Sequence, residues 1–279
     1  MAIKIYSVYQ AAKDLGGLSN HKLVIELHKN HFSCLVIDEL NEIMAFEFFE
    51  FENTEFDIEV ILSEVMMDSR ILDKSFSSTE LYFNTEQAVL IPKSHNSSTE
   101  VDDFLNVACG NSYTTENKLD SIASNSEIEV AYRVPNDFIT HINRRLIAVE
   151  YHHTYSKIIK ELFNSKKEIP PYFIKLQVYK NHLILVVIKH NKLQLIQSFI
   201  YKTTYDALYY LMNTCNQFEI PNEELQVELN GFIDLQSSFY LELVKYFRNI
   251  SLQEVEANTA SQFNQYPPHY FAAFINLAL

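Results

Sequence analysis

Glycine is scarce in this chain of 279 residues, which has only four, Gly16, Gly17, Gly110 and Gly231, against a usual share of about 7%. Glycine-rich loops bind phosphate because backbone N–H groups that lack a neighbouring Cβ can approach the anion closely. The scarcity of glycine therefore excludes most loops of this kind.

Cysteines and long apolar runs are also few. Cys34, Cys109 and Cys215 are widely separated and form no C-x-x-C pair, so neither a disulfide framework nor a structural zinc site is expected. The longest aliphatic run, Leu183 to Ile188, has six residues, whereas a membrane-spanning helix needs about 20. Residues 1–10 also lack the basic start and apolar centre of a secretory signal. We therefore expect a cytoplasmic protein that does not insert into a membrane.

Positive charge is in deficit. Lys and Arg number 22 against 36 Asp and Glu, which gives a net charge of -14. An anionic surface repels nucleic acid unless a local basic patch is present, and the sequence contains no such patch. Hydrophobic residues make up 47% of the chain, as in an ordinary folded protein, and the length favours two domains.

The chain repeats one pattern with an offset of 151 residues. Residues 23–51 and 172–201 each read as three strands joined by short turns, with β-branched and aromatic residues in the strands. Lys29, Asn30 and His31 in the first turn coincide with Lys180, Asn181 and His182 in the second. The two stretches are therefore interpreted as two copies of one meander.

A helix is expected after each meander. Thr54 and Thr203 are each followed three positions later by an Asp, a variant of the capping box that begins helices. Apolar residues with helical spacing follow both and predict one buried stripe per helix. The expected stripes are Ile58, Ile61, Leu62, Val65 and Met66 in the first helix, and Tyr205, Leu208, Tyr209 and Met212 in the second.

The remaining elements complete two α/β domains. We expect residues 80–83 to pair with 88–91, a surface excursion over about 111–126, and a buried final helix over 270–279. Further expected elements are a helix near 101–108, strands over 127–134 and 147–150, helices from 135 to 145 and around 155–163, and a strand over 225–229. The Pro170-Pro171 pair breaks the chain. We therefore predict a first domain over 1–168 and a second over 169–279.

Two tandem units of three antiparallel strands, a helix and further alternating elements resemble the actin-like ATPase fold, a duplicated ribonuclease H-like domain. Val134-Pro135-Asn136 before a helix, a short strand ending at Glu150, and the alanine-rich end 272–279 resemble the pilus-assembly branch of that fold. The chain is also similar to an uncharacterised bacterial family with an actin-like fold. The resemblance implies two mixed sheets, each opening with a three-stranded antiparallel meander and flanked by helices.

The chain departs from the resemblance at the phosphate-binding positions. Active relatives carry Asp-x-Gly in each first hairpin, where this chain has Glu26-Leu27-His28 and Gln177-Val178-Tyr179. The Gly-Gly that binds adenosine is reduced to Asn230-Gly231. The candidate site residues are therefore the degenerate positions Glu26, His28, Gln177, Tyr179 and Gly231. No catalytic residue, metal ligand or cofactor is predicted, because bulky side chains replace the close backbone approach that phosphate needs.

Other chemistries have less support. Glu26 alone does not support a ribonuclease H-like nuclease. Such an enzyme needs several acids that converge to hold metal ions and a basic groove for the nucleic acid. His28 and His31 flank a turn without further metal ligands, and are interpreted as a structural cross-strand pair. Phe46 to Phe51 form either a central strand covered on both faces or an exposed apolar patch.

We therefore expect a non-catalytic actin-like scaffold that binds a protein or peptide partner, and not an enzyme. The alternative is a degenerate nucleotide-binding protein or ATPase that uses Glu26 and a remodelled cleft between its domains. A small-molecule sensor with a changed ligand is a third possibility.

Overall fold

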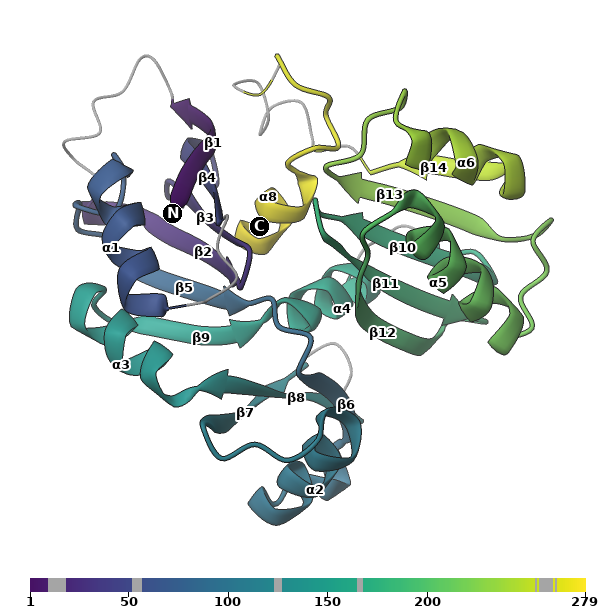
Figure 1. Cartoon of the computed structure of the whole chain (residues 1–279), viewed down its shortest axis with the longest axis horizontal. Coiled ribbons are helices and arrows are strands. Elements are labelled where there is room, and N and C mark those ends of the chain that lie inside the picture. Colours follow the sequence, from purple (N-terminus) through teal and green to yellow (C-terminus); the bar gives the residue numbers. More distant parts are fainter. Residues whose placement is uncertain are drawn as a thin grey trace. The chain divides into compact units, whose positions relative to one another are not determined.

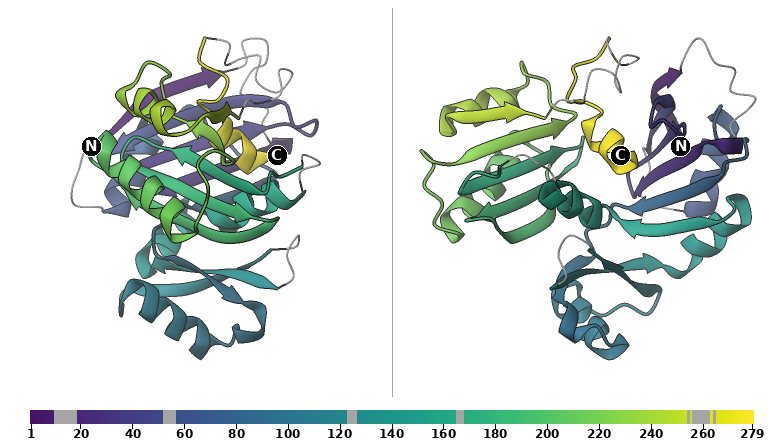
Figure 2. Two further views of the ribbon diagram at one scale, coloured as in Figure 1. Left: turned by 90° about the vertical axis from the view of Figure 1, so that its right-hand side faces the viewer. Right: turned by 180° about the vertical axis from the view of Figure 1, so that it is seen from behind.

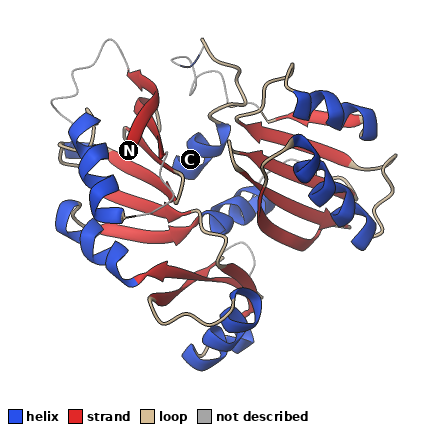
Figure 3. Cartoon of the chain, in the orientation of Figure 1, coloured by secondary structure: helices blue, strands red, loops and turns tan. Residues whose placement is uncertain are grey.

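The computed structural model describes residues 1–9, 19–51, 57–122, 127–164, 168–253, 255, 263 and 265–279. The chain divides into two compact units, each of which contains both helices and strands (Figure 3). The first unit holds residues 1–164, 258–262 and 274–279, and the second holds 165–257 and 263–273. Residues 274–279 therefore group with the first unit, whereas the sequence had placed them in the second domain.

The first unit is built on a six-stranded sheet of order β1-β4-β3-β2-β5-β9. The strands are β1 (Ala2–Tyr9), β2 (Lys22–His28), β3 (His31–Ile37), β4 (Ile43–Phe51), β5 (Ser78–Phe83) and β9 (Val149–His153). The neighbouring strands β1–β4, β4–β3 and β3–β2 pair antiparallel, and the neighbours β2–β5 and β5–β9 pair parallel. The predicted meander is confirmed, with Lys29 and Asn30 as the turn between β2 and β3.

Three helices accompany this sheet: α1 (Ile58–Asp68), α3 (Asn136–Arg145) and α4 (Thr154–Asn164). In Figure 1, α1 and α3 lie side by side next to the sheet. The expected cap residue Thr54 lies outside the described residues. Instead Asp57 is the N-cap, because its carboxylate accepts hydrogen bonds from the N–H groups of Glu59 and Val60 at 2.9 and 3.3 Å.

A separate three-stranded sheet of order β6-β8-β7 corrects two predictions. Its strands are β6 (Ala88–Pro92), β7 (Thr115–Ser121) and β8 (Ile128–Pro135), and α2 (Ser98–Cys109) packs on it after a short 3-10 helix (Lys93–His95) (Figure 2). β6 pairs with β8 and not with β5, because β2 and β9 already occupy both edges of β5. The expected excursion 111–126 contains β7, which pairs with β8 despite its polar composition; residues 123–126 lie outside the described residues.

The second unit has a five-stranded sheet of order β12-β11-β10-β13-β14. The strands are β10 (Tyr172–Val178), β11 (His182–Lys189), β12 (Lys192–Ile200), β13 (Gln226–Gly231) and β14 (Asn249–Leu252). β10 to β12 form the predicted antiparallel meander, and β10, β13 and β14 run parallel. Two packed helices, α5 (Thr204–Gln217) and α6 (Ser238–Tyr246), lie beside this sheet (Figure 1).

The α5 helix begins as predicted but buries only part of the expected stripe. Thr203 and Asp206 form a complete capping box. The buried side is made of Ala207, Leu208, Leu211, Thr214 and Cys215, whereas Tyr205 and Tyr209 of the expected stripe are 71% and 64% exposed. The small and aliphatic stripe allows close packing on the sheet and α6, so the larger tyrosine side chains face solvent.

The aromatic strand β4 is covered on both faces, because side chains alternate along a strand and the phenylalanines on both sides, Phe46 and Phe48 on one and Phe49 and Phe51 on the other, are buried. Phe274 of the final helix α8 (Ala272–Ala278) packs its ring 5.5 Å from that of Phe46 and 5.4 Å from that of Phe48. Of the two alternatives left open for Phe46 to Phe51, the strand covered on both faces is therefore the one that the structure has. In the ranges that the structure describes, no helix has both the length and the apolar character needed to cross a membrane.

Candidate functional site

The first hairpin, β2–β3, places Glu26 in a closed polar environment. Glu26 is 1% exposed, and both of its carboxylate oxygens have hydrogen-bond partners. Oε2 lies 3.1 Å from Nε2 of His31, and Oε1 accepts from Nδ2 of Asn84 at 3.3 Å and from Oγ1 of Thr154 at 3.1 Å. Thr154 is the first residue of α4, so this carboxylate joins β2, β3, the end of β5 and a helix start.

A pair of stacked rings closes the turn of this hairpin. His28 and His31 face each other across the strands, with ring centroids 5.1 Å apart. The N–H of Asn30 donates to Nδ1 of His28 at 3.2 Å, and Nε2 of His28 lies 3.5 Å from Oε1 of Glu86. Burial lowers the pKa of His28 to about 4, so its imidazole is neutral at pH 7. The His28 ring therefore accepts a hydrogen bond from one backbone N–H of the turn, that of Asn30.

The second hairpin, β10–β11, has the same arrangement with different side chains. The Tyr179 ring stacks on that of His182 at 4.3 Å, nearly parallel, and the N–H of Tyr179 donates to the carbonyl oxygen of His182 at 2.9 Å. Nε2 of Gln177 donates to the hydroxyl of Tyr179 at 2.5 Å, and the hydroxyl of Tyr201 donates to the carbonyl oxygen of Tyr179. Gln177, Tyr179 and His182 are all buried.

Gly231 ends β13 beside Val178 of β10, so the structure brings it close to Gln177 and Tyr179. Its φ is +86°, and a Cβ at this position would lie 2.1 Å from the carbonyl oxygen of Val178. Its N–H donates to the carbonyl oxygen of His269 at 2.9 Å. The glycine is therefore required by close backbone packing, and its N–H is already used.

The five candidate residues thus lie at or near the carboxyl ends of β2, β10 and β13. Glu26 and His28 share the first hairpin, and the other three meet in the second unit. Among the residues that the structure describes, no three His, Cys, Asp or Glu side chains come together as a metal site. The arrangement consists of buried side chains whose hydrogen bonds are made internally.

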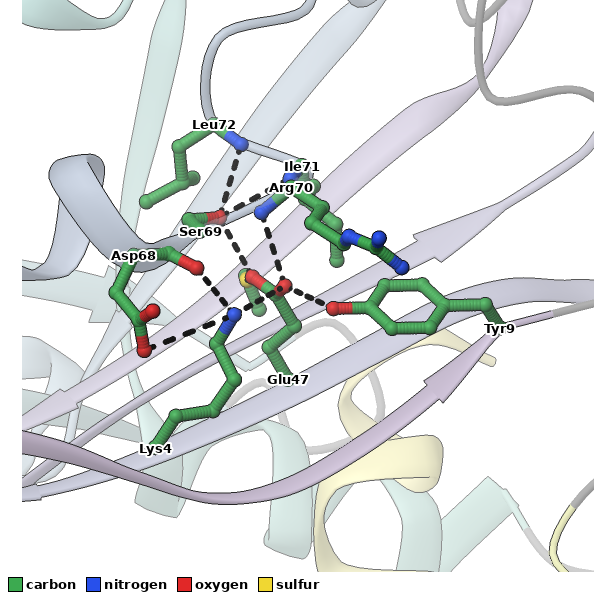
Figure 4. A network of polar contacts seen from close by, with 9 residues as sticks. Lys4, Tyr9, Glu47, Asp68, Ser69, Arg70, Ile71 and Leu72 are labelled. Carbon is green, nitrogen blue, oxygen red and sulfur yellow. Dashed lines mark hydrogen bonds and ion pairs between the residues drawn. The ribbon is translucent and has the colours of Figure 1, made fainter.

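A buried charged cluster around Glu47 was not recognised from the sequence. Glu47 is fully buried in β4, and its Oε1 lies 3.1 Å from Nζ of Lys4 and accepts from the N–H of Arg70 at 3.0 Å (Figure 4). The hydroxyl of Tyr9 also donates to Oε1, and that of Ser69 donates to Oε2 at 2.5 Å. The sequence signal for this cluster was an acidic residue, Glu47, between phenylalanines in an otherwise apolar strand. The cluster joins β1, β4 and the segment after α1.

Helices α5 and α6 pack together, and both carry exposed apolar side chains in the second unit. We name the set of Tyr205 and Tyr209 on α5 with Leu241 and Val244 on α6 the α5–α6 face. The four side chains are between 44% and 71% exposed. Tyr205 and Tyr209 share one side of α5, and Leu241 and Val244 share one side of α6, and apolar side chains that gather into a patch mark interaction surfaces.

Comparison with known proteins gives a family and a fold. The model of a family described as "Protein of unknown function (DUF3822)" matches residues 10–250. A Bacteroides thetaiotaomicron protein with an actin-like ATPase fold and unknown function is similar over 96% of this chain and 99% of its own, with 17% identity and a TM-score of 0.78. The PilM–PilN type IV pilus biogenesis complex contains a chain similar over 92% of this chain and 97% of its own, with 11% identity and a TM-score of 0.62. No curated protein sequence gives a significant match. The resemblance to an actin-like fold is therefore confirmed.

Proposed function

Since this chain belongs to the DUF3822 family, whose function is unknown, we propose its function from its geometry. The protein is a non-catalytic scaffold with an actin-like fold that binds a protein or peptide partner. In this proposal the positions that hold phosphate in active relatives have become part of the hydrophobic and hydrogen-bonded core.

The proposal includes an internal duplication of a ribonuclease H-like domain. The strand order β4-β3-β2-β5-β9 of the first unit matches β12-β11-β10-β13-β14 of the second, with the same strand directions. The N–H of Asn84 donates to the carbonyl oxygen of Leu27 at 2.9 Å, and that of Phe232 donates to Val178 at 2.8 Å. Leu27 and Val178 are 151 residues apart, the offset of the sequence repeat, so equivalent positions make equivalent bonds.

The stacked ring pair of each hairpin is the observation that carries the non-catalytic proposal. Phosphate binding at such turns needs free backbone N–H groups and the absence of side chains over them. His28 and His31 cover one turn, and Tyr179 and His182 cover the other, all of them buried. A phosphate group at either turn would have to displace the ring pair of that turn, which loses its packing and its hydrogen bonds together.

Calorimetric titration with Mg-ATP tests this proposal. We expect no saturable heat up to millimolar nucleotide, because binding energy would first be spent on opening the hairpins. The matched control is Glu26→Gln, which removes the carboxylate that could hold magnesium. Micromolar binding by the wild type that disappears in Glu26→Gln would show that the protein is a nucleotide-binding protein, and the scaffold proposal would be wrong.

The α5–α6 face is the surface that we assign to the partner. Its two tyrosines supply large, semi-rigid contact area, which is typical of binding hot spots. A second copy of this chain is disfavoured as the occupant, because two molecules of net charge -14 repel each other. We therefore assign a different protein or peptide with an apolar contact surface that is not acidic. The similarity to a chain of a two-protein pilus complex supports partner binding in general.

Photo-crosslinking in cells tests this assignment. A photoreactive phenylalanine at Tyr209 is compared with the same residue at Met67, which is 88% exposed on α1 and lies outside the face. We expect an adduct with a different protein from position 209 and none from 67, and Tyr205→Ser should reduce its yield. Equal adducts at both positions, or none at 209, would contradict the assignment. An adduct at twice 32.6 kDa would identify a second copy instead.

A further inference from the structure

A polar pocket of about 470 Å³ lies within the first unit, apart from both the hairpin turns and the α5–α6 face. Residues from β2, β5, β7, β9, α4 and the end of the chain line it. Glu26 and His28 do not contribute to its lining among the described residues. A volume of this size suits a small metabolite, since pockets for small molecules measure about 300–1,000 Å³.

The sheet face beneath the pocket is polar, although the opposite face is an ordinary core. Glu80 pairs in register with Glu150, and Tyr82 with His152, so these four side chains project from one face of β5 and β9. Between them in β5, Leu81 is fully buried on the other face. A sheet face covered by a helix is usually apolar, because buried polar groups must find partners. The polarity here therefore indicates a face built for a polar ligand.

The acidic groups of the pocket are already engaged within the protein. Glu80 pairs with Nζ of Lys22 at 2.7 Å and accepts from the hydroxyl of Tyr82 at 2.9 Å. Asp120 accepts from the N–H of His153 at 2.6 Å and from the hydroxyl of Ser156 at 2.7 Å. The third acid, Glu150, lies 3.9 Å from the imidazole of His152. Glu80 and Asp120 therefore have internal donors before any ligand arrives, whereas the contact of Glu150 is longer than a hydrogen bond.

Two lysine side chains of the pocket, unlike its acids, have no close partner of opposite charge in the described residues. Lys157 and Lys160 are one turn apart on α4, and both line the pocket. In the part of the chain that the structure describes, neither has a carboxylate within ion-pair distance. Lys157 is half-buried, and burial together with the nearby charge of Lys22 lowers its pKa. A half-buried cation without a close counter-charge is stabilised when an anion binds beside it.

We propose that this pocket binds a small organic anion whose carboxylate or phosphate group lies against Lys157 and Lys160. The hydroxyl of Tyr82 and the carboxylates of Asp120 and Glu150 line the same pocket. Because a carboxylate accepts several hydrogen bonds, both acids can also accept from hydroxyl or amino groups of the ligand. The ligand is therefore a small hydroxylated or amino-bearing acid, or its phosphate ester. This proposal does not depend on partner binding or on the loss of ATP binding.

Calorimetry and thermal-shift measurements with four probes test the proposal: inorganic phosphate, glycerol phosphate, malate and serine. We expect at least one organic probe to bind with a stoichiometry of one per chain and to raise the melting temperature. Binding of glycerol phosphate alone identifies a phosphate ester, and binding of malate or serine identifies a carboxylate. Inorganic phosphate alone would show an adventitious ion only, and binding by none of the probes would overturn the proposal.

Variants at the two lysines separate a built site from nonspecific attraction. Lys157→Gln should weaken binding by about tenfold or more, which corresponds to the loss of about 1.4 kcal/mol of binding free energy. Lys157→Arg should retain most of the affinity, which shows that the charge matters. The matched control Lys192→Gln removes an exposed lysine of the second unit and should leave binding unchanged. Equal affinity of the wild type and Lys157→Gln, with both folded, would contradict the assignment.

Discussion

The buried ion pair between Lys4 and Glu47 gives the most direct test of how the first unit is stabilised. Glu47 is fully buried, and the Lys4 side chain is 16% exposed, with 3.1 Å between Nζ and Oε1. Lys4→Met keeps much of the length of the side chain but removes its charge. The carboxylate of Glu47 would then remain in the core without its only close cation in the described residues.

The expected cost follows from the partners that Glu47 retains. Removing one member of a buried ion pair costs about 3–5 kcal/mol, because the other charge stays desolvated and unpaired. Here the N–H of Arg70 and the hydroxyls of Tyr9 and Ser69 still donate to the carboxylate. We therefore expect the lower end of the range, a loss of about 3 kcal/mol in the free energy of unfolding.

A double-mutant cycle measured by urea unfolding checks this value. Adding Glu47→Gln to Lys4→Met removes the stranded charge, so the double variant should recover about 1–2 kcal/mol relative to additive losses. Lys74→Met is the matched control, because Lys74 pairs with Asp73 at 3.0 Å on the surface and should cost less than about 1 kcal/mol. Additive losses, or a cost of Lys4→Met no greater than that of the control, would refute the reasoning.

Three further predictions concern the hairpins and helix starts. The pKa of His28 is about 4 in the fold and about 6.5 when unfolded, so the unfolded chain binds the proton first as the pH falls. The neutral, buried His28 therefore contributes about 3 kcal/mol to the free energy of unfolding above pH 6.5, and this contribution is lost as the pH falls towards 4. His28→Asn should flatten the dependence of the urea midpoint on pH. Parallel curves for the wild type and the variant would contradict this. Gly231→Ala should cost about 3 kcal/mol or more, since its Cβ would clash with Val178, whereas Gly110→Ala, at φ +80° and ψ 170° with open space around it, should cost about 2 kcal/mol in thermal unfolding through backbone strain alone. Thr203→Ala should lower stability by about 1 kcal/mol through loss of the helix cap, and an unchanged melting temperature would show that the cap is dispensable.

Local patterns in the sequence determined the elements that depend on neighbouring residues. Strands rich in β-branched and aromatic residues, joined by short turns, predicted both meanders, and Thr203 with Asp206 predicted the start of α5, because these signals act within a few residues. The same offset located Glu26, His28, Gln177 and Tyr179 at equivalent strand ends. The replacement of glycine by ring side chains at these positions could be read directly from the chain.

Only the tertiary structure decided which surfaces met. Two apolar stripes of α5 compete in the sequence, and packing buried Leu211 while exposing Tyr205. The partner of β6 depended on which edges of β5 were already occupied, a choice made by residues far apart in the chain. The Glu47 cluster and the pocket at Lys157 likewise combine strands and helices that no local pattern connects. Charge and shape complementarity between distant segments arises only when the chain has folded. Glu47 among phenylalanines could therefore be noticed in the sequence, but its partners and the pocket could not be assigned from it.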